Sequence, residues 1–201
     1  LTETPHRFKP VNIYYHTYIA SKTAALESLL TVYRWAQSQP LHPVFASDYA
    51  RKVLDFNTMV IAREGNGWRI KGEGQLRTLR LPDALALPSL PGSKGIAGYR
   101  EDGPGRYVHL SANEAHWQPG PDPVPYLQQA NARLTMFARE EKGFRFSLAG
   151  HTDLEFAIGN AVGCTLNHNG GSLTPVRREG TLYHYRSAKH GLEELRLHCS
   201  H

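Results

Sequence analysis

The spacing of apolar residues divides the chain into a short part with helical periodicity and a longer part with alternating runs. An apolar run at Val11–Tyr18 predicts a buried strand. A stripe with three- and four-residue spacing follows it at Leu26, Leu29, Leu30 and Tyr33. This stripe predicts a helix that Ser21 can cap and that ends near Gln39-Pro40.

The pattern then repeats once. Residues 42–45 predict a second extended piece, and Ser47 can cap an amphipathic helix that carries Tyr49, Val53, Leu54 and Phe56. Strand, helix, strand and helix in this order are typical of the crossover units of parallel sheets. Two strands cannot form a sheet with its own core, so residues 1–57 are expected to be the closing βα elements of a larger α/β domain.

From residue 58 onward, short alternating runs are separated by glycine turns. Residues 59–63 and 68–71 flank Glu64-Gly65-Asn66-Gly67, which predicts a hairpin. Alternation is clear at 144–148, 154–158 and 195–199, and further strands are expected at 75–81, 96–100, 106–110, 132–139, 165–167 and 182–186. The proline-rich stretches 81–91 and 117–125 are expected to be connections.

Many short strands at this spacing predict two packed antiparallel sheets. The expected fold class is therefore α+β and mainly β. It combines the terminal βα elements of a (β/α) domain at 1–57 with an antiparallel β-sandwich at 58–201.

Composition narrows the classes of partner. The chain has 201 residues, of which 40% are hydrophobic, so it can bury a core. No apolar run is long enough to span a bilayer, and membrane insertion is not expected. The net charge is +5, but Lys and Arg are scattered among Asp and Glu without a recognised nucleic-acid motif. We therefore expect no nucleic-acid partner.

The cysteines and histidines are the candidates for covalent or metal chemistry. Cys164 and Cys199 both fall in strand-like runs, which leaves open a disulfide in an oxidising compartment or two buried thiols. The eleven histidines include no His-x-x-x-His pair on a predicted helix, and there is no Cys-x-x-Cys. No metal site is predicted within this chain. Gly150-His151-Thr152-Asp153 lacks a nucleophile elbow, which favours a turn.

His16 differs from the other histidines because it stands at the end of a predicted parallel strand. Side chains at that end point toward the edge where α/β folds carry out their chemistry. His16 is therefore a candidate general acid, with Tyr14 and Tyr18 beside it as candidate substrate-binding residues. A histidine whose ring nitrogens are satisfied inside a sheet is the alternative.

A family resemblance bears on this candidate. The run 10–18, Ser21-Lys22, the helix through Trp35 and the run 43–50 together resemble the closing βα elements of a polysaccharide deacetylase domain. The segments 76–82, 95–99, 106–110, 125–127 and 148–151 extend the similarity over nearly the whole chain. In this order they are similar to the C-terminal region of the PelA family, the periplasmic deacetylase/hydrolases of Pel exopolysaccharide biosynthesis.

The resemblance implies a periplasmic enzyme that removes N-acetyl groups from an N-acetylgalactosamine-containing polysaccharide of the biofilm matrix. In such deacetylases a last-strand histidine, here His16, protonates the leaving amine. The segments that supply the base and hold a divalent metal, zinc or similar, are absent from this sequence and are expected upstream of Leu1. No cofactor is therefore expected within this chain, which alone should be inactive or nearly so.

The β region has two competing roles. It can bind or guide the amino-sugar polymer, with Trp68, Tyr99, Tyr107 or Trp117 stacking on sugar rings, although core packing explains the same residues. Trp117 is the best stacking candidate because the following Gln118-Pro119-Gly120-Pro121 predicts a loop. Alternatively, as the resemblance implies, the region docks onto a tetratricopeptide-repeat scaffold of the export machinery. An unrelated lectin-like domain is a third interpretation.

Overall fold

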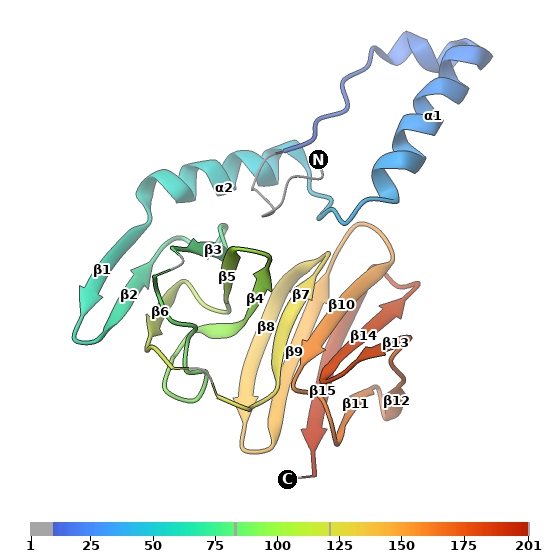
Figure 1. Ribbon diagram of the computed structural model, residues 1–201. Helices are drawn as coiled ribbons and strands as arrows, with labels where there is room; N and C mark the ends of the chain where they lie inside the picture. Colours follow the sequence, from blue (N-terminus) through green and yellow to red (C-terminus); the bar gives the residue numbers. More distant parts are fainter. Residues whose placement is uncertain (1–9, 83, 121, 201) are drawn as a thin grey trace.

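The computed structural model describes residues 10–82, 84–120 and 122–200, and within them the chain is mainly β (Figure 1). The helical elements are the 3-10 helix η1 (Thr17–Ser21), α1 (Thr23–Gln37) and α2 (Ala46–Thr58). The strands of the first half are β1 (Val60–Glu64), β2 (Gly67–Lys71), β3 (Thr78–Leu81), β4 (Ile96–Asp102), β5 (Gly105–Leu110) and β6 (Glu114–Trp117). Those of the second half are β7 (Tyr126–Ala130), β8 (Arg133–Glu140), β9 (Gly143–Ala149), β10 (Leu154–Gly159), β11 (Cys164–His168), β12 (Gly171–Leu173), β13 (Arg177–Glu179), β14 (Leu182–Ser187) and β15 (Gly191–Cys199).

The strand predicted at Val11–Tyr18 is wrong for the described structure. Residues 10–16 form no regular element, and Thr17 begins η1. Residues 42–45 likewise form no strand. A strand is stable only when a neighbour satisfies its backbone groups, and the described residues supply no partner for either segment.

The two predicted helices are confirmed, but the cap and the covering of α1 are not as expected. Ser21 lies inside η1, where its hydroxyl donates to the Tyr18 carbonyl oxygen at 2.7 Å, and Lys22 precedes α1 without a side-chain cap. No residue of α1 is buried. The helix projects away from the sheets in Figure 1, and Leu26, Leu29 and Leu30 of its apolar stripe are only half-buried.

Two small antiparallel sheets follow α2. The predicted hairpin is confirmed as β1 and β2, and Gly65, with φ of +58°, begins its two-residue turn. Strand β6 extends it to the order β1-β2-β6, and a second sheet has the order β3-β5-β4. A shared core lies between them, formed by Ile70, Leu90, Ile96, Tyr99, Val108, Leu110, Ala115 and Trp117.

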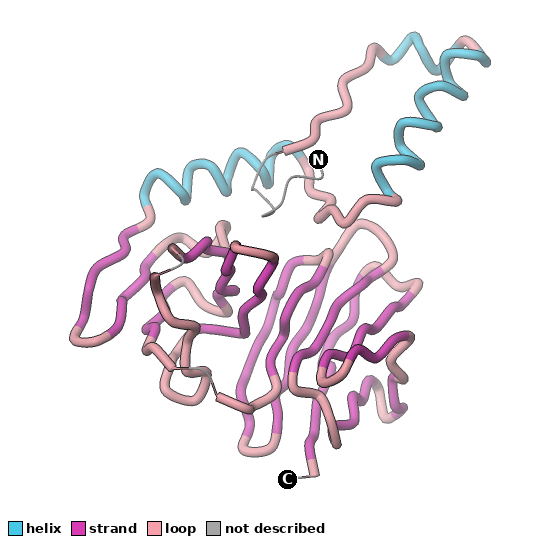
Figure 2. Tube along the Cα trace, in the orientation of Figure 1, coloured by secondary structure: helices cyan, strands magenta, loops and turns pink. Residues whose placement is uncertain are grey.

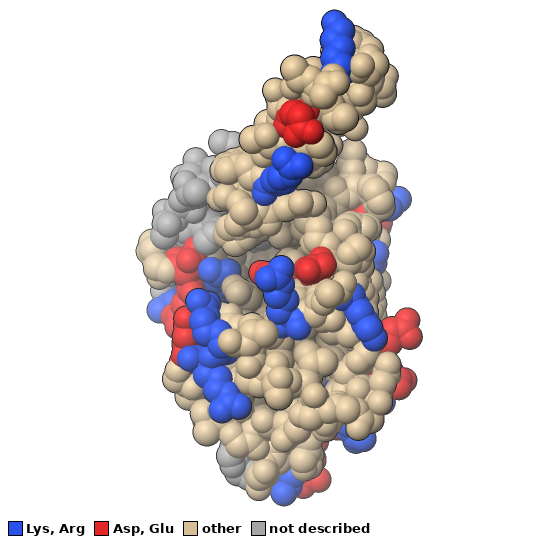
Figure 3. All heavy atoms as spheres, turned by 90° about the vertical axis from the view of Figure 1, so that its right-hand side faces the viewer, with Lys and Arg blue, Asp and Glu red and all other residues tan. Residues whose placement is uncertain are grey.

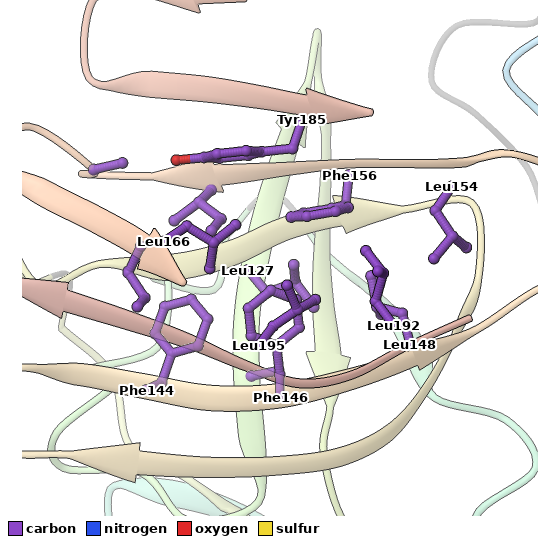
Figure 4. Close-up of a cluster of buried hydrophobic side chains, with 14 of the residues drawn as sticks. Leu127, Phe144, Phe146, Leu148, Leu154, Phe156, Leu166, Tyr185, Leu192 and Leu195 are labelled. Carbon is purple, nitrogen blue, oxygen red and sulfur yellow. The ribbon is translucent and has the colours of Figure 1, made fainter. Parts of the chain in front are cut away.

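Two larger antiparallel sheets form the second half. Their strand orders are β13-β14-β10-β7 and β12-β11-β15-β9-β8, and the long strands run side by side in Figure 2. Side chains from both sheets meet in one core (Figure 4), as the alternation at 144–148, 154–158 and 195–199 predicts. Phe146 contacts the Phe144 and Phe156 rings at centroid distances of 5.4 and 5.7 Å, and Phe156 stacks on Tyr185 at 5.2 Å.

Four strands were not expected from the sequence: β6, β7, β12 and β13. Strand β6 includes Trp117, and β7 begins directly after the proline-rich stretch, so both lie at the borders of a segment interpreted as a connection. None of the described helices is both long and apolar enough to cross a membrane.

Candidate functional site

The three residues predicted to form the catalytic edge lie together, although not on a strand. His16 precedes η1 and is exposed. Its ring stacks on Tyr18 at a centroid distance of 5.2 Å and meets the edge of Tyr14 at 5.4 Å. Tyr14 is 78% exposed and Tyr18 is 63% exposed. Residues 14–18, here called the aromatic arm, therefore present an imidazole between two phenols to the surroundings.

The aromatic arm is connected to α1 through a second pair of rings. Tyr15 meets the edge of Tyr33 at a centroid distance of 6.3 Å. The pKa of the Tyr33 phenol is raised, first by desolvation and then by Tyr15. The arm and α1 thus form one exposed unit with aromatic side chains on both parts.

The carboxylate of Asp55 ties helix α2 to the β region. Asp55 is 1% exposed and accepts hydrogen bonds from the backbone N–H groups of Glu73, Gln75 and Leu76 at 2.7, 2.6 and 2.8 Å. Burial alone would raise the pKa of this carboxyl, but the three donors outweigh burial and the pKa is lowered. Asp55 therefore holds α2 against the connection between β2 and β3.

Positive groups gather where α2, the β2–β3 connection and the start of β8 meet. Lys52 donates from Nζ to the Gln75 carbonyl oxygen at 3.1 Å, and Arg77 donates to the Gly74 carbonyl oxygen and to Asn113. The pKa values of Lys52 and Arg77 are lowered, first by desolvation and next by repulsion from Arg133. Lys52 and Arg77 therefore act here as hydrogen-bond donors that hold the segments of the junction together.

Two histidines border this junction from the N-terminal connection and from the predicted turn at 150–153. The His151 ring packs on Phe45 at a centroid distance of 4.5 Å. Although His42 lies at the surface, crowding around its ring lowers its pKa to about 4, first through desolvation and then through Lys52 and His151. The His42 and His151 rings therefore lie where the connection between α1 and α2 meets the turn between β9 and β10.

The aromatic residues proposed to stack on sugar are mostly core residues, which corrects that expectation. Trp117 lies in β6, pairs with Trp68 of β2 and is 3% exposed, so its predicted loop position is wrong. Tyr99 and Tyr107 are buried as well. Trp117 ends a strand that satisfies the edge of β2, and this pairing takes its ring into the core instead of leaving it accessible to sugar.

The divalent metal implied by the family resemblance is expected in the upstream part of the deacetylase domain and not within this chain. Across 10–82, 84–120 and 122–200, no three His, Cys, Asp or Glu side chains gather into a set that could hold a metal ion.

The two cysteines form a disulfide, which decides between the two alternatives left open by the sequence. Cys164 and Cys199 are cross-strand partners in β11 and β15. The bond joins strands whose sequence separation is 35 residues.

Sequence reasoning missed Asp55 as an anchoring residue, although a signal was present. An acidic side chain in the last turn of a helix is unfavourable because it faces the negative end of the helix dipole. Asp55 lies in that position in α2. Its presence there indicates a compensating interaction outside the helix.

Comparison with protein-family models, curated proteins and solved structures finds no match for this chain.

Proposed function

We propose that the N-terminal part of this chain completes a carbohydrate deacetylase domain of the PelA family and that the β region is its accessory domain. The observation that carries the proposal is the uncovered apolar surface of the two helices. The side chains concerned are between 37% and 68% exposed: Val32, Tyr33, Trp35, Val53, Leu54 and Phe56.

This surface calls for a covering layer. An isolated helix of 15 residues is marginal in water, so α1 needs packing partners beyond those that the described residues supply. The rest of an α/β domain would cover α1 and would also offer a neighbouring strand to residues 10–16. The aromatic arm would then lie at the edge of a sheet, as the family resemblance implies.

Within that domain His16 would hold a proton on its imidazole and deliver it to the leaving amine as the N-acetyl group is hydrolysed. Tyr14 and Tyr18 flank the His16 ring and would bind the sugar on either side. The base and the divalent metal of the deacetylase are proposed to belong to the remainder of the domain. This division of groups would leave the present chain inactive by itself.

The proposed setting is the periplasm. The disulfide between Cys164 and Cys199 supports it, since such bonds persist in oxidising compartments. Residues 58–201, with the two larger sheets as their β-sandwich, would form an accessory domain that binds the N-acetylgalactosamine-containing exopolysaccharide during biofilm matrix biosynthesis.

The test is acetate release from an N-acetylgalactosamine oligomer with added divalent metal. It compares this chain with a polypeptide extended upstream through the deacetylase domain. Activity is expected only in the longer polypeptide, with loss on His16→Ala and retention on His190→Ala, a control at an exposed histidine. Activity in the short chain, or full activity of the His16→Ala polypeptide, would refute the proposal.

A second candidate role for the β region, docking onto another protein, rests on strand β1. Every residue of the edge strand β1 is exposed, and its Val60 and Ile61 side chains offer apolar area that the surface of a helical-repeat protein could cover. The alternative is therefore docking onto a tetratricopeptide-repeat export scaffold. Capture of that scaffold should be lost on Ile61→Lys and unaffected by saturating oligosaccharide. Retained capture by Ile61→Lys would exclude β1 as the docking edge.

A further inference from the structure

The outer face of the sheet β13-β14-β10-β7 carries an ordered row of polar side chains. The register aligns Arg177 with His184, His184 with Ala157, and Ala157 with Gln129. Alternation along β10 turns Phe156 and Ile158 into the core, so Ala157 belongs to the opposite face. Ala157 is fully buried and lies in neither core cluster, so side chains of this outer face must cover it.

A groove of about 380 Å³ runs over this face. Its lining includes Gln129, Glu155, Val176, Arg177, His184 and Arg186. Arg100 of β4 donates to Gln129 Oε1 at 2.5 Å and so fixes one wall of the groove.

The charges around the groove nearly cancel. Glu179 lies 3.2 Å from Arg177 Nε and 3.3 Å from His184 Nε2. Arg186 lies 3.6 Å from both Glu155 and Asp153. Figure 3, which faces the side of β13 and β14, shows Lys and Arg interspersed with Asp and Glu. A polyanion would meet a carboxylate beside each of these arginines, so the groove suits a neutral ligand rich in hydrogen-bonding groups.

The side chains offer such hydrogen bonds in several geometries. Guanidinium and amide groups donate from a plane, carboxylates accept, and imidazole can do either. Because Gln129 Oε1 is occupied by Arg100, the amide nitrogen of Gln129 remains to donate to a ligand. Val176 is 67% exposed at the rim and supplies apolar area. Hydroxyl groups, acetamido groups and the C–H face of a sugar ring match this combination.

We propose that this groove binds a neutral chain of N-acetylated hexosamine, and this assignment of the ligand rests on the proposed function. The chain would lie across β14 and β10, with its hydroxyl and acetamido groups bonded to Gln129, His184 and Arg177. Binding would depend on hydrogen bonds and not on net charge, so it should weaken little as salt is raised.

The test is calorimetric titration of this chain with an N-acetylgalactosamine oligomer at 50 and 300 mM salt, with heparin as a polyanionic probe. His184→Ala and Gln129→Ala are expected to weaken oligomer binding at least tenfold at either salt. The matched control is His198→Ala, at an exposed histidine in β15 of the other large sheet. Unchanged thermal unfolding of each variant shows that its fold is retained.

Three outcomes would overturn the inference: no oligomer binding, equal binding by His184→Ala and His198→Ala, or heparin binding that exceeds oligomer binding and is lost with salt. The result is separable from the deacetylase proposal, which acetate release by the extended polypeptide tests. Oligomer binding at the groove without acetate release would support the groove and refute the enzyme.

Discussion

At the scale of single residues, the buried Asp55 and the partly buried His109 show how polar groups join elements that are distant in sequence. Asp55 joins α2 to the β2–β3 connection through three backbone donors. His109 joins two sheets, because its Nε2 lies 2.7 Å from the Gln128 carbonyl oxygen and its Nδ1 lies 3.2 Å from Thr78 Oγ1. Neither residue belongs to a sequence motif.

Replacing Asp55 with Asn should destabilise the chain. An amide oxygen can accept some of the three N–H groups, but the amide nitrogen faces a donor and leaves at least one N–H group unpaired. The expected loss in the free energy of unfolding is about 1–3 kcal/mol by urea denaturation. Asp48→Asn, at a surface ion pair in the same helix, should cause little change. Equal effects of the two variants would contradict the anchoring role of Asp55.

His109 should make stability depend on pH. Burial is the main cause that lowers its pKa to about 4 from the ordinary 6.5, and the bond to Gln128 does not offset it. Below pH 6.5 the unfolded chain takes up a proton that the folded chain refuses until about pH 4. Stability is therefore lost as pH falls through this window, by up to about 3 kcal/mol.

The measurement is urea unfolding at pH 7.5 and 4.5. His109→Gln should show a smaller loss between the two pH values than the wild-type chain, whereas His190→Gln, at an exposed position, should keep the wild-type difference. An identical loss in all three proteins would show that His109 titrates normally in the folded chain.

The sequence predicts the burial of a residue well where burial follows from alternation within one strand. It predicts burial poorly where burial depends on pairing with a distant strand. The burial of Phe144, Phe146 and Leu197 follows directly from alternating runs. The burial of Trp117 does not, because it depends on pairing with a strand 49 positions earlier at Trp68. The row formed by Gln129, Ala157 and His184 likewise requires a register that no local pattern specifies.

At the scale of elements, the disulfide holds β11 and β15 together near one edge of the five-stranded sheet. Strand β11 is five residues long and pairs with β15 on one side and the three-residue β12 on the other. Short strands near an edge are easily lost when the chain fluctuates. A covalent bond between β11 and β15 restricts the unfolded chain and keeps β11 in register.

Replacing both cysteines with alanine should lower the free energy of unfolding by about 2–4 kcal/mol. Reduction of the wild-type chain should have a comparable effect and raise the thiol titre. Urea unfolding with and without reductant provides the measurement, and reductant should not affect the double variant. An unchanged thiol titre on reduction of the wild-type chain would refute the bond.

The elements fall into two groups: those that signals within the segment predict, and those that depend on neighbouring segments. Both helices follow from the periodicity of their apolar residues and the β1–β2 hairpin from its glycine turn, whereas neither predicted cap, Ser21 or Ser47, caps its helix. The strand expected at Val11–Tyr18 depends on neighbours that the described residues do not provide. For the candidate site, the prediction that Tyr14, His16 and Tyr18 lie together holds because they are close in sequence. The predicted strand conformation of their backbone is wrong.

At the scale of the whole molecule, burial is distributed unevenly. The two core clusters lie entirely in the β region, whereas α1 buries none of its residues and α2 buries Asp55 alone. Figure 1 shows the same division, with α1 extending from the body of sheets. The N-terminal part therefore contributes little to either core, and the central claim of the proposed function is that an upstream domain covers it.

Amide hydrogen exchange of α1 tests this claim most directly. In the present chain the α1 amides should exchange quickly while those of β9 and β15 remain protected. In a polypeptide extended upstream through the deacetylase domain, exchange of the α1 amides should slow by at least about 100-fold, and Trp35→Lys should restore fast exchange. Equally fast exchange of α1 in both polypeptides would show that no upstream domain covers this helix and would contradict the account.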